Sequence, residues 1–136
     1  MQHIFWQILD YFFIIFHTAL IFFNLFGWLV KRTRMANFIS LSLTGASWGL
    51  LGLFYGLGYC PLTDWHYQIL YEINVYNMPD SYVLYLLQRL AGISVNEKLI
   101  DLFTLIFFLI AFCCSVFFNF LKPKIDKQTS KTTLKI

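Results

Sequence analysis

Three long apolar runs separated by two polar stretches dominate the chain. They extend from about residue 4 to 30, from 38 to 59 and from 99 to 121, and few charged residues interrupt them. Each run can cross roughly 30 Å of hydrocarbon as an α-helix, which rises about 1.5 Å per residue. Helices are expected because lipid offers the backbone no hydrogen-bonding partners. The pattern therefore predicts an all-α bundle of three transmembrane helices.

We expect these spans to form one membrane domain over residues 1–121. It includes a loop at 60–98 and is followed by a Lys-rich tail at 122–136. Pro61 ends the second run because proline lacks the backbone donor that a helix needs. The tail has little apolar surface to bury, so we expect it to be disordered or to lie on anionic lipid headgroups.

The composition indicates a membrane rather than an aqueous environment. Of the 136 residues, 59% are hydrophobic and 12% are charged, whereas soluble domains carry about 25% charged residues. The net charge of +3 does not indicate a nucleic-acid partner, because the basic residues lie beside the apolar runs without interleaved stacking aromatics. The first run has no Lys or Arg before it and no small-residue cleavage site after it, so we expect it to be retained.

Most basic residues follow either the first or the third run. They are Lys31, Arg32, Arg34, Lys122, Lys124, Lys127, Lys131 and Lys135. Because Lys and Arg near span ends are held on the cytoplasmic side, the two groups predict the same orientation. The N-terminus and the loop at 60–98 should lie outside, and the C-terminus should be cytoplasmic.

The loop contains the signals of a first short helix. Thr63 or Asp64 can cap a helix extending to about Tyr76. Its mixture of apolar and polar residues is typical of a helix lying on the membrane surface. We do not expect a fourth span, because each charged residue of the loop would cost several kcal/mol within lipid.

A second short helix is expected over 81–91, after a turn at 77–80, and Gly92 should close it. Ser94 and Glu97 match a capping box, in which each side chain satisfies the other's backbone, so the third span should begin there. Aromatic residues expected on the outer side are typical of a belt at the membrane interface. They are Trp6, Tyr59, Trp65, Tyr67, Tyr71 and Tyr82.

Polar residues recur within the spans. Asp10, His17 and Asn24 are seven residues apart, which places them on one helix face that should be turned toward protein. Several chemically capable side chains should gather near the outer surface, forming a candidate polar site: Asp10, His17, Cys60, Thr63, Asp64, His66 and Asp101. Histidine, carboxylates and a thiol could bind a divalent metal or perform acid–base chemistry. Their spacing matches no zinc pattern, so we predict no metal and favour interhelical hydrogen bonding.

Small residues mark the expected packing centre of the bundle. Gly45, Gly49, Gly52 and Gly56 share one side of the second span, and small residues four apart allow helix backbones to approach closely. The cysteines argue against a thiol oxidoreductase, which needs paired surface cysteines. Cys60 is alone outside, and the other two lie deep in the third span.

The chain resembles a family of small bacterial membrane proteins catalogued as domain of unknown function 2784. The matching features are His17, the Ser47-Trp48-Gly49 region, Cys60-Pro61-Leu62-Thr63, and Ser81-Tyr82-Val83-Leu84-Tyr85-Leu86. The resemblance covers about residues 8 to 121. It implies a three-span helical protein of the bacterial inner membrane and brings no established activity. The family commonly has an acidic residue where this chain has His66.

Two functions follow from these features. We favour a non-catalytic protein that binds a membrane-protein partner, as a small accessory subunit or a homo-oligomer, because the chain is short and its loop is rich in Tyr and Trp. The alternative is an enzyme or a metal- or ligand-binding protein working through the candidate polar site. A transporter ranks last because the sequence has no internal repeat. No cofactor is identified by the sequence.

Overall fold

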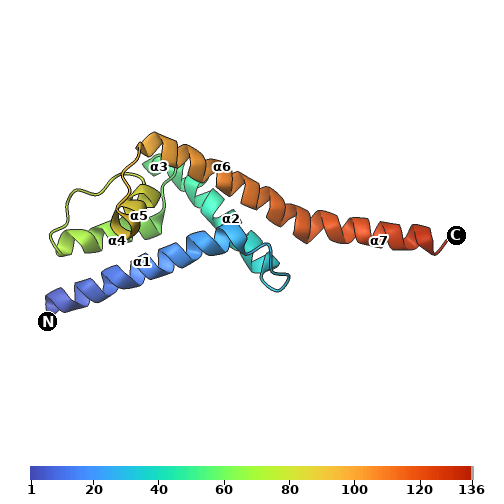
Figure 1. Cartoon of the computed structure of the whole chain (residues 1–136), viewed down its shortest axis with the longest axis horizontal. Helices are drawn as coiled ribbons and strands as arrows, with labels where there is room; N and C mark the ends of the chain where they lie inside the picture. Colours follow the sequence, from blue (N-terminus) through green and yellow to red (C-terminus); the bar gives the residue numbers. More distant parts are fainter. Residues whose placement is uncertain (136) are drawn as a thin grey trace.

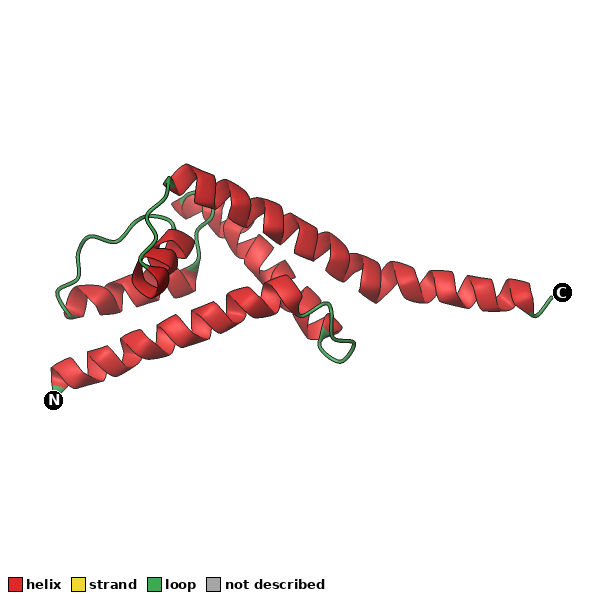
Figure 2. Cartoon of the chain, in the orientation of Figure 1, coloured by secondary structure: helices red, strands yellow, loops and turns green. Residues whose placement is uncertain are grey.

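The structure is a computed structural model that describes residues 1–135. Within that range the chain consists of helices and loops without a strand (Figure 2). The elements, with η marking a π-helical turn, are α1 (Gln2–Phe26), α2 (Arg34–Ala46), η1 (Ser47–Leu51), α3 (Gly52–Tyr55), α4 (Pro61–Glu72), α5 (Tyr82–Ala91), α6 (Glu97–Val116), η2 (Phe117–Leu121) and α7 (Lys122–Thr133).

Three helical stretches are long and apolar enough to cross a membrane. They are Gln2–Phe26, Arg34–Tyr55 and Glu97–Thr133, which confirms the predicted all-α architecture. In the most apolar 18 residues of each stretch, only 17%, 11% and 11% of the residues are buried inside the chain. The greater part of each span is therefore left for lipid or for another protein.

The first two spans are displaced toward the N-terminus from the predicted ranges. The first span ends at Phe26, and the turn that follows is closed by hydrogen bonds from Thr33 Oγ1 to the Gly27 carbonyl at 2.7 Å and from Arg34 Nε to the Trp28 carbonyl at 3.0 Å. The second span ends before Gly56, whose φ of 109° leaves the helical region. A glycine conformation, and not proline, stops this helix.

The helices form an open arrangement (Figure 1). α2 crosses between α1 and α6 and contacts both, while α4 and α5 occupy the space beside the N-terminal half of α1. α4 runs alongside α1. A helix lying flat on the membrane surface, as expected for this segment, would instead cross an upright span. A small core of Ile14, Leu70, Tyr82, Tyr85 and Leu86 joins α1, α4 and α5.

The C-terminal tail is helical, whereas it was expected to be disordered or to lie on lipid headgroups. α6, η2 and α7 form one continuous rod that projects beyond the other helices. A helix is costly to nucleate but cheap to extend, so the already formed α6 can propagate into the polar tail. The residues of α7 are exposed along their whole length.

The starts of the loop helices differ in part from the prediction. α4 begins at Pro61 with Cys60 as its N-cap and without a side-chain capping bond among the described residues. α5 agrees with the prediction, since Ser81 accepts from the Leu84 amide and Gly92 closes the helix with φ of 67°. The predicted cap for α4 at Thr63 or Asp64 was wrong.

The capping box predicted before α6 is also absent from the described chain. Asn96, and not Ser94, accepts a hydrogen bond from the Leu99 amide, at 3.4 Å. Glu97 Oε1 instead accepts from the backbone amide of Ser81 at 2.6 Å. Glu97 therefore ties the beginning of α6 to the beginning of α5.

The polar face of the first span is turned toward protein, as predicted, and it meets polar side chains of the second span. Asp10, His17 and Asn24 are all buried. Asn24 donates to Thr44 Oγ1 at 3.1 Å and accepts from Ser40 Oγ at 2.6 Å. Hydrogen bonds of this kind between membrane helices contribute about 0.6 kcal/mol on average, so they align α1 and α2 more than they stabilise them.

The four glycines of the second span do not form one packing face. A Cβ at Gly45 would lie 3.2 Å from Phe108 Cζ of α6, so Gly45 does sit at a helix contact. A Cβ at Gly49 would meet nothing within 4 Å in residues 1–135, and one at Gly52 would meet the loop backbone at Leu57 and Gly58. Gly56 lies outside the helix. The π-helical turn at η1 shifts the register, so the four positions no longer share a face.

We expect Gly45→Val to destabilise the bundle by about 1–3 kcal/mol, because the added methyl groups would separate α2 from α6. Gly49→Val is the control, since it makes the same substitution in the same span, at a position where the added atoms meet open space. Thermal unfolding in detergent micelles measures both. Equal effects of the two variants would contradict the close approach at Gly45.

Candidate functional site

The carboxylate of Asp10 on α1 is the centre of a buried polar network. Only 2% of Asp10 is exposed. Its Oδ1 accepts hydrogen bonds from Arg89 Nη1 and His66 Nε2, both at 2.8 Å, and its Oδ2 accepts from Arg89 Nη2 at 2.6 Å. The paired bonds to Arg89 make a bidentate ion pair, a strong and directional geometry. Asp10 thereby joins α1 to both α4 and α5.

Helical periodicity explains why these side chains converge. On α4, His66 shares a buried face with Ile69 and Leu70, which are three and four residues further on. On α5, Tyr82, Tyr85 and Arg89 recur at spacings of three and four residues and share the face turned toward α1 and α4. We call Asp10, His66, Tyr82, Tyr85 and Arg89 the Asp10 network.

His66 bridges the carboxylate and a phenol. Its Nδ1 lies 2.7 Å from the hydroxyl of Tyr82, and none of the residue is exposed to solvent. Burial lowers the pKa of His66, the positive charge of Arg89 lowers it further, and Asp10 opposes both effects. His66 is therefore neutral, with Nε2–H donating to Asp10 and Nδ1 accepting from the Tyr82 hydroxyl.

The phenols of the network are held in their neutral form. Burial raises the pKa of Tyr82 and of Tyr85. Arg89 donates to the hydroxyl of Tyr85, and its guanidinium carbon lies 5.9 Å from the centres of the Tyr11 and Tyr85 rings. One carboxylate, one guanidinium and neutral partners thus make a network whose charges balance internally.

His17 lies next to this network without a hydrogen bond to it. Its ring stacks on Tyr82 with the ring centres 4.1 Å apart. Its Nδ1 is buried without a hydrogen-bond partner in the described chain. His17 therefore contributes packing to Tyr82, and it extends the line of polar groups along α1 toward Asn24.

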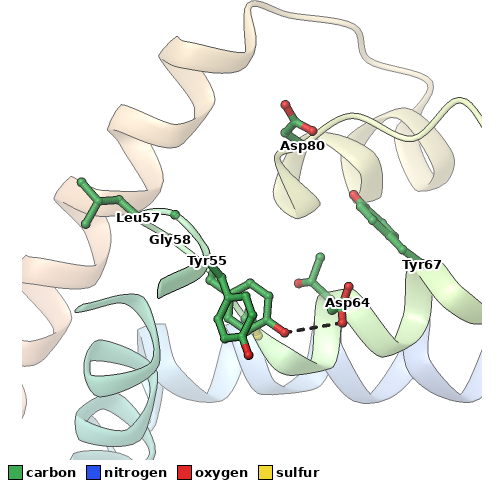
Figure 3. Close-up of a pocket in the computed structure, with 10 residues that line it drawn as sticks. Tyr55, Leu57, Gly58, Asp64, Tyr67 and Asp80 are labelled. Atoms are coloured by element: carbon green, nitrogen blue, oxygen red, sulfur yellow. Dashed lines mark hydrogen bonds between the residues drawn. The ribbon is translucent and has the colours of Figure 1, made fainter. Parts of the chain in front are cut away.

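The other predicted site residues lie elsewhere. Cys60, Thr63 and Asp64 line a separate surface pocket of about 330 Å³, together with residues of the α3–α4 loop, Tyr67 and Asp80. Figure 3 shows Asp64 between Tyr55 and Tyr67, with Asp80 across the pocket. Asp64 Oδ2 accepts from Gln68 Nε2 at 3.1 Å and from the Tyr59 hydroxyl at 3.5 Å.

Asp101 belongs to neither place, because it is exposed on the surface of α6. The expected single polar site is thus divided into the Asp10 network, the surface pocket and an isolated carboxylate. Across residues 1–135, no three His, Cys, Asp or Glu side chains are close enough to hold a metal ion together. The division follows from α4, on which Asp64 and His66 are about 200° apart around the axis.

Sequence reasoning missed three members of the Asp10 network. Tyr82 was assigned to an aromatic belt and to the family resemblance, Tyr85 only to that resemblance, and Arg89 counted only as one of the unnamed charged residues that argued against a fourth span. The available signal was Arg89 itself, the single charged residue of α5, near the end of that helix. Such a charge requires a counter-ion once the helix is buried.

Residues 7–120 match the model of a protein family described as Protein of Unknown function (DUF2784). The chain belongs to this family. The match covers the Asp10 network, the surface pocket and the apolar part of all three spans, and it confirms the resemblance seen in the sequence. No curated protein and no solved structure matches the chain. In this DUF2784 protein, function must therefore be inferred from the geometry.

We expect Arg89→Gln to destabilise the fold by about 3 kcal/mol, because it leaves the carboxylate of Asp10 buried without a counter-ion. The value lies at the low end of the range for buried pairs, since 30% of the Arg89 side chain is exposed. Thermal unfolding in detergent measures the loss. Lys98→Gln, which removes an exposed cation, should have almost no effect, and Asp10→Asn combined with Arg89→Gln should recover part of the stability.

Acidification should weaken the docking of α4 onto α1. The pKa of His66 is lowered in the folded protein from 6.5, so below about that pH the unfolded chain binds more protons than the folded one. The stabilisation is complete above about pH 6.5 and decreases as the pH falls toward the folded pKa. Unfolding at pH 7.5 and pH 5.5 should show a smaller loss in His66→Gln than in the unchanged protein. An identical loss would contradict a neutral His66.

Proposed function

We propose that this chain is a multi-pass protein of the bacterial inner membrane, with its N-terminus outside and its C-terminus in the cytoplasm. The basic residues that follow the first span and those that follow the third meet at one end of the bundle, which supports this orientation. The guanidinium carbon of Arg34 and the ammonium of Lys122 lie 4.8 Å and 5.3 Å from the centre of the Phe118 ring. Asn119 Nδ2 donates to the Arg34 carbonyl at 3.0 Å. Two basic groups on one side obey the rule that orients membrane proteins.

We propose further that the protein acts without catalysis, by binding a partner in the membrane. The observation that carries this proposal is that the reactive groups of the Asp10 network are already hydrogen-bonded to one another. Both oxygens of Asp10 and both ring nitrogens of His66 are engaged by other members of the network. An acid–base catalyst must instead reach a substrate. Neither Asp10 nor His66 lines the surface pocket at the start of α4 or a second hollow between α1 and α4.

The network has a mechanical role in this proposal. It holds α4 and α5 against α1 in one orientation, and α4 then presents its opposite side outward. Trp65 and Tyr71 on that side are 54% and 50% exposed, and Tyr76 just after the helix is 62% exposed. Trp and Tyr combine large apolar area with little conformational entropy, and they dominate binding hot spots.

A groove beside these aromatics extends the surface. It has a volume of about 280 Å³ and lies between α1 and α4, lined by Trp6, Leu9, Trp65, Gln68, Ile69 and Glu72. Its mainly apolar lining, with Gln68 and Glu72 as the polar members, resembles the mixed composition of protein interfaces. The partner is therefore expected to contact α4 and the N-terminal end of α1 together, as a membrane-protein subunit or a second copy of this chain would.

A photo-crosslinking amino acid placed at Tyr71 should give one discrete adduct in intact cells. The same probe at Ile93, which is similarly exposed but lies in the loop before α6, should give none. Size-exclusion chromatography with mass measurement in mild detergent should show a stoichiometric complex or a defined homo-oligomer. A monomer in detergent, with no adduct from Tyr71, would refute the proposal.

A further inference from the structure

The surface pocket at the start of α4 combines two carboxylates with three tyrosines, and none of its lining residues is a member of the Asp10 network. It is open to the surface and is bordered by the α3–α4 loop, α4 and the segment before α5 (Figure 3). We call it the tyrosine pocket. Its lining is Tyr55, Gly56, Leu57, Gly58, Tyr59, Cys60, Thr63, Asp64, Tyr67 and Asp80.

The charge of the pocket is negative. Asp64 and Asp80 are its only ionisable carboxyl groups, and no Lys, Arg or His is among its lining residues. The side-chain hydrogen bonds that Asp64 accepts come from an amide and a phenol, which are neutral donors and supply no counter-ion. A positively charged ligand is therefore the one that the pocket attracts.

Aromatic rings distinguish an organic cation from a metal ion. Tyr55 and Tyr59 are stacked with ring centres 4.6 Å apart, and Tyr67 lines the pocket beyond Asp64. Burial raises the pKa of Tyr67, so its phenol stays neutral. Ring faces attract ammonium groups, whereas hard divalent ions require six or more oxygen ligands. We propose that the tyrosine pocket binds the ammonium group of an organic cation, with Asp64 and Asp80 as counter-ions.

The walls of the pocket are already in place without a ligand. Ser47 Oγ donates to the Tyr59 carbonyl at 2.9 Å, which attaches the α3–α4 loop to the second span. The hydroxyl of Tyr67 donates to the Pro79 carbonyl at 2.7 Å, which attaches the segment carrying Asp80 to α4. Binding to such a pre-formed site avoids the free-energy cost of ordering loops.

Two sources could supply the ammonium group. One is a phospholipid with an ethanolamine headgroup, because the pocket adjoins the end of the second span, where headgroups lie. The other is a soluble amine or quaternary ammonium compound. The pocket chemistry is the same in both cases, and it does not depend on the partner-binding proposal.

Isothermal titration calorimetry of the full-length protein, in a maltoside detergent without ammonium groups, tests the proposal. Tetramethylammonium chloride and ethanolammonium chloride are titrated at an ionic strength held constant with sodium chloride. We expect saturable binding that is weakened at least tenfold in Asp64→Asn and in Asp80→Asn, and also in Tyr59→Leu. Asp80 is exposed, so its replacement tests the charge without disturbing packing. Asp101→Asn removes an equal charge outside the pocket and should leave the affinity unchanged.

A second arm identifies the source of the ammonium group. In nanodiscs made of phosphatidylethanolamine, the apparent affinity for tetramethylammonium should fall relative to phosphatidylglycerol nanodiscs if the lipid occupies the pocket. Equal affinity in both assigns the pocket to soluble cations. The proposal is overturned by an absence of saturable binding in detergent, by an equal loss in Asp101→Asn, or by calcium chloride binding more tightly than either ammonium salt.

Discussion

The burial of one carboxylate governs the arrangement of the chain outside the spans. Asp10 is almost inaccessible on α1, and an ionised group in such a place is tolerated only with a counter-ion and further hydrogen bonds. Arg89 supplies the first and His66 the second. These partners lie on two different helices of the loop, so satisfying Asp10 positions α4 and α5 together. The small apolar core beneath them could not specify that orientation as narrowly.

The same constraint assigns structural and binding roles to different parts of the loop. The carboxylate of Asp10, the imidazole of His66 and the guanidinium of Arg89 are occupied within the Asp10 network. The outer side of α4 is then aromatic, and the pocket at the beginning of α4 is acidic. An exposed aromatic surface suits a protein partner, while an acidic pocket walled by tyrosines suits an ammonium group. Both surfaces depend on the same support, since each includes α4, which Asp10 holds in place through His66.

The spans themselves contribute little internal packing. Gly45 brings α2 against α6, and Asn24 aligns α1 with α2, but most of each span faces outward. Because lipid tails are as apolar as leucine, burying these faces within the chain would bring no hydrophobic gain. A bundle of this kind retains broad lateral surfaces and is well suited to assembly with another membrane protein.

The sequence alone determined the features that depend on local composition and period. Apolar length predicted three spans, a seven-residue recurrence placed Asp10, His17 and Asn24 on a buried face, and a turn followed by apolar spacing and a closing glycine located α5. Only the tertiary structure decided which polar groups meet. Asp10 and Arg89 are separated by 79 residues, and no periodicity relates positions so far apart. The same limit explains why Asp64 and His66 were expected in one site: their closeness along the chain concealed that a helix turns two such neighbours to nearly opposite sides.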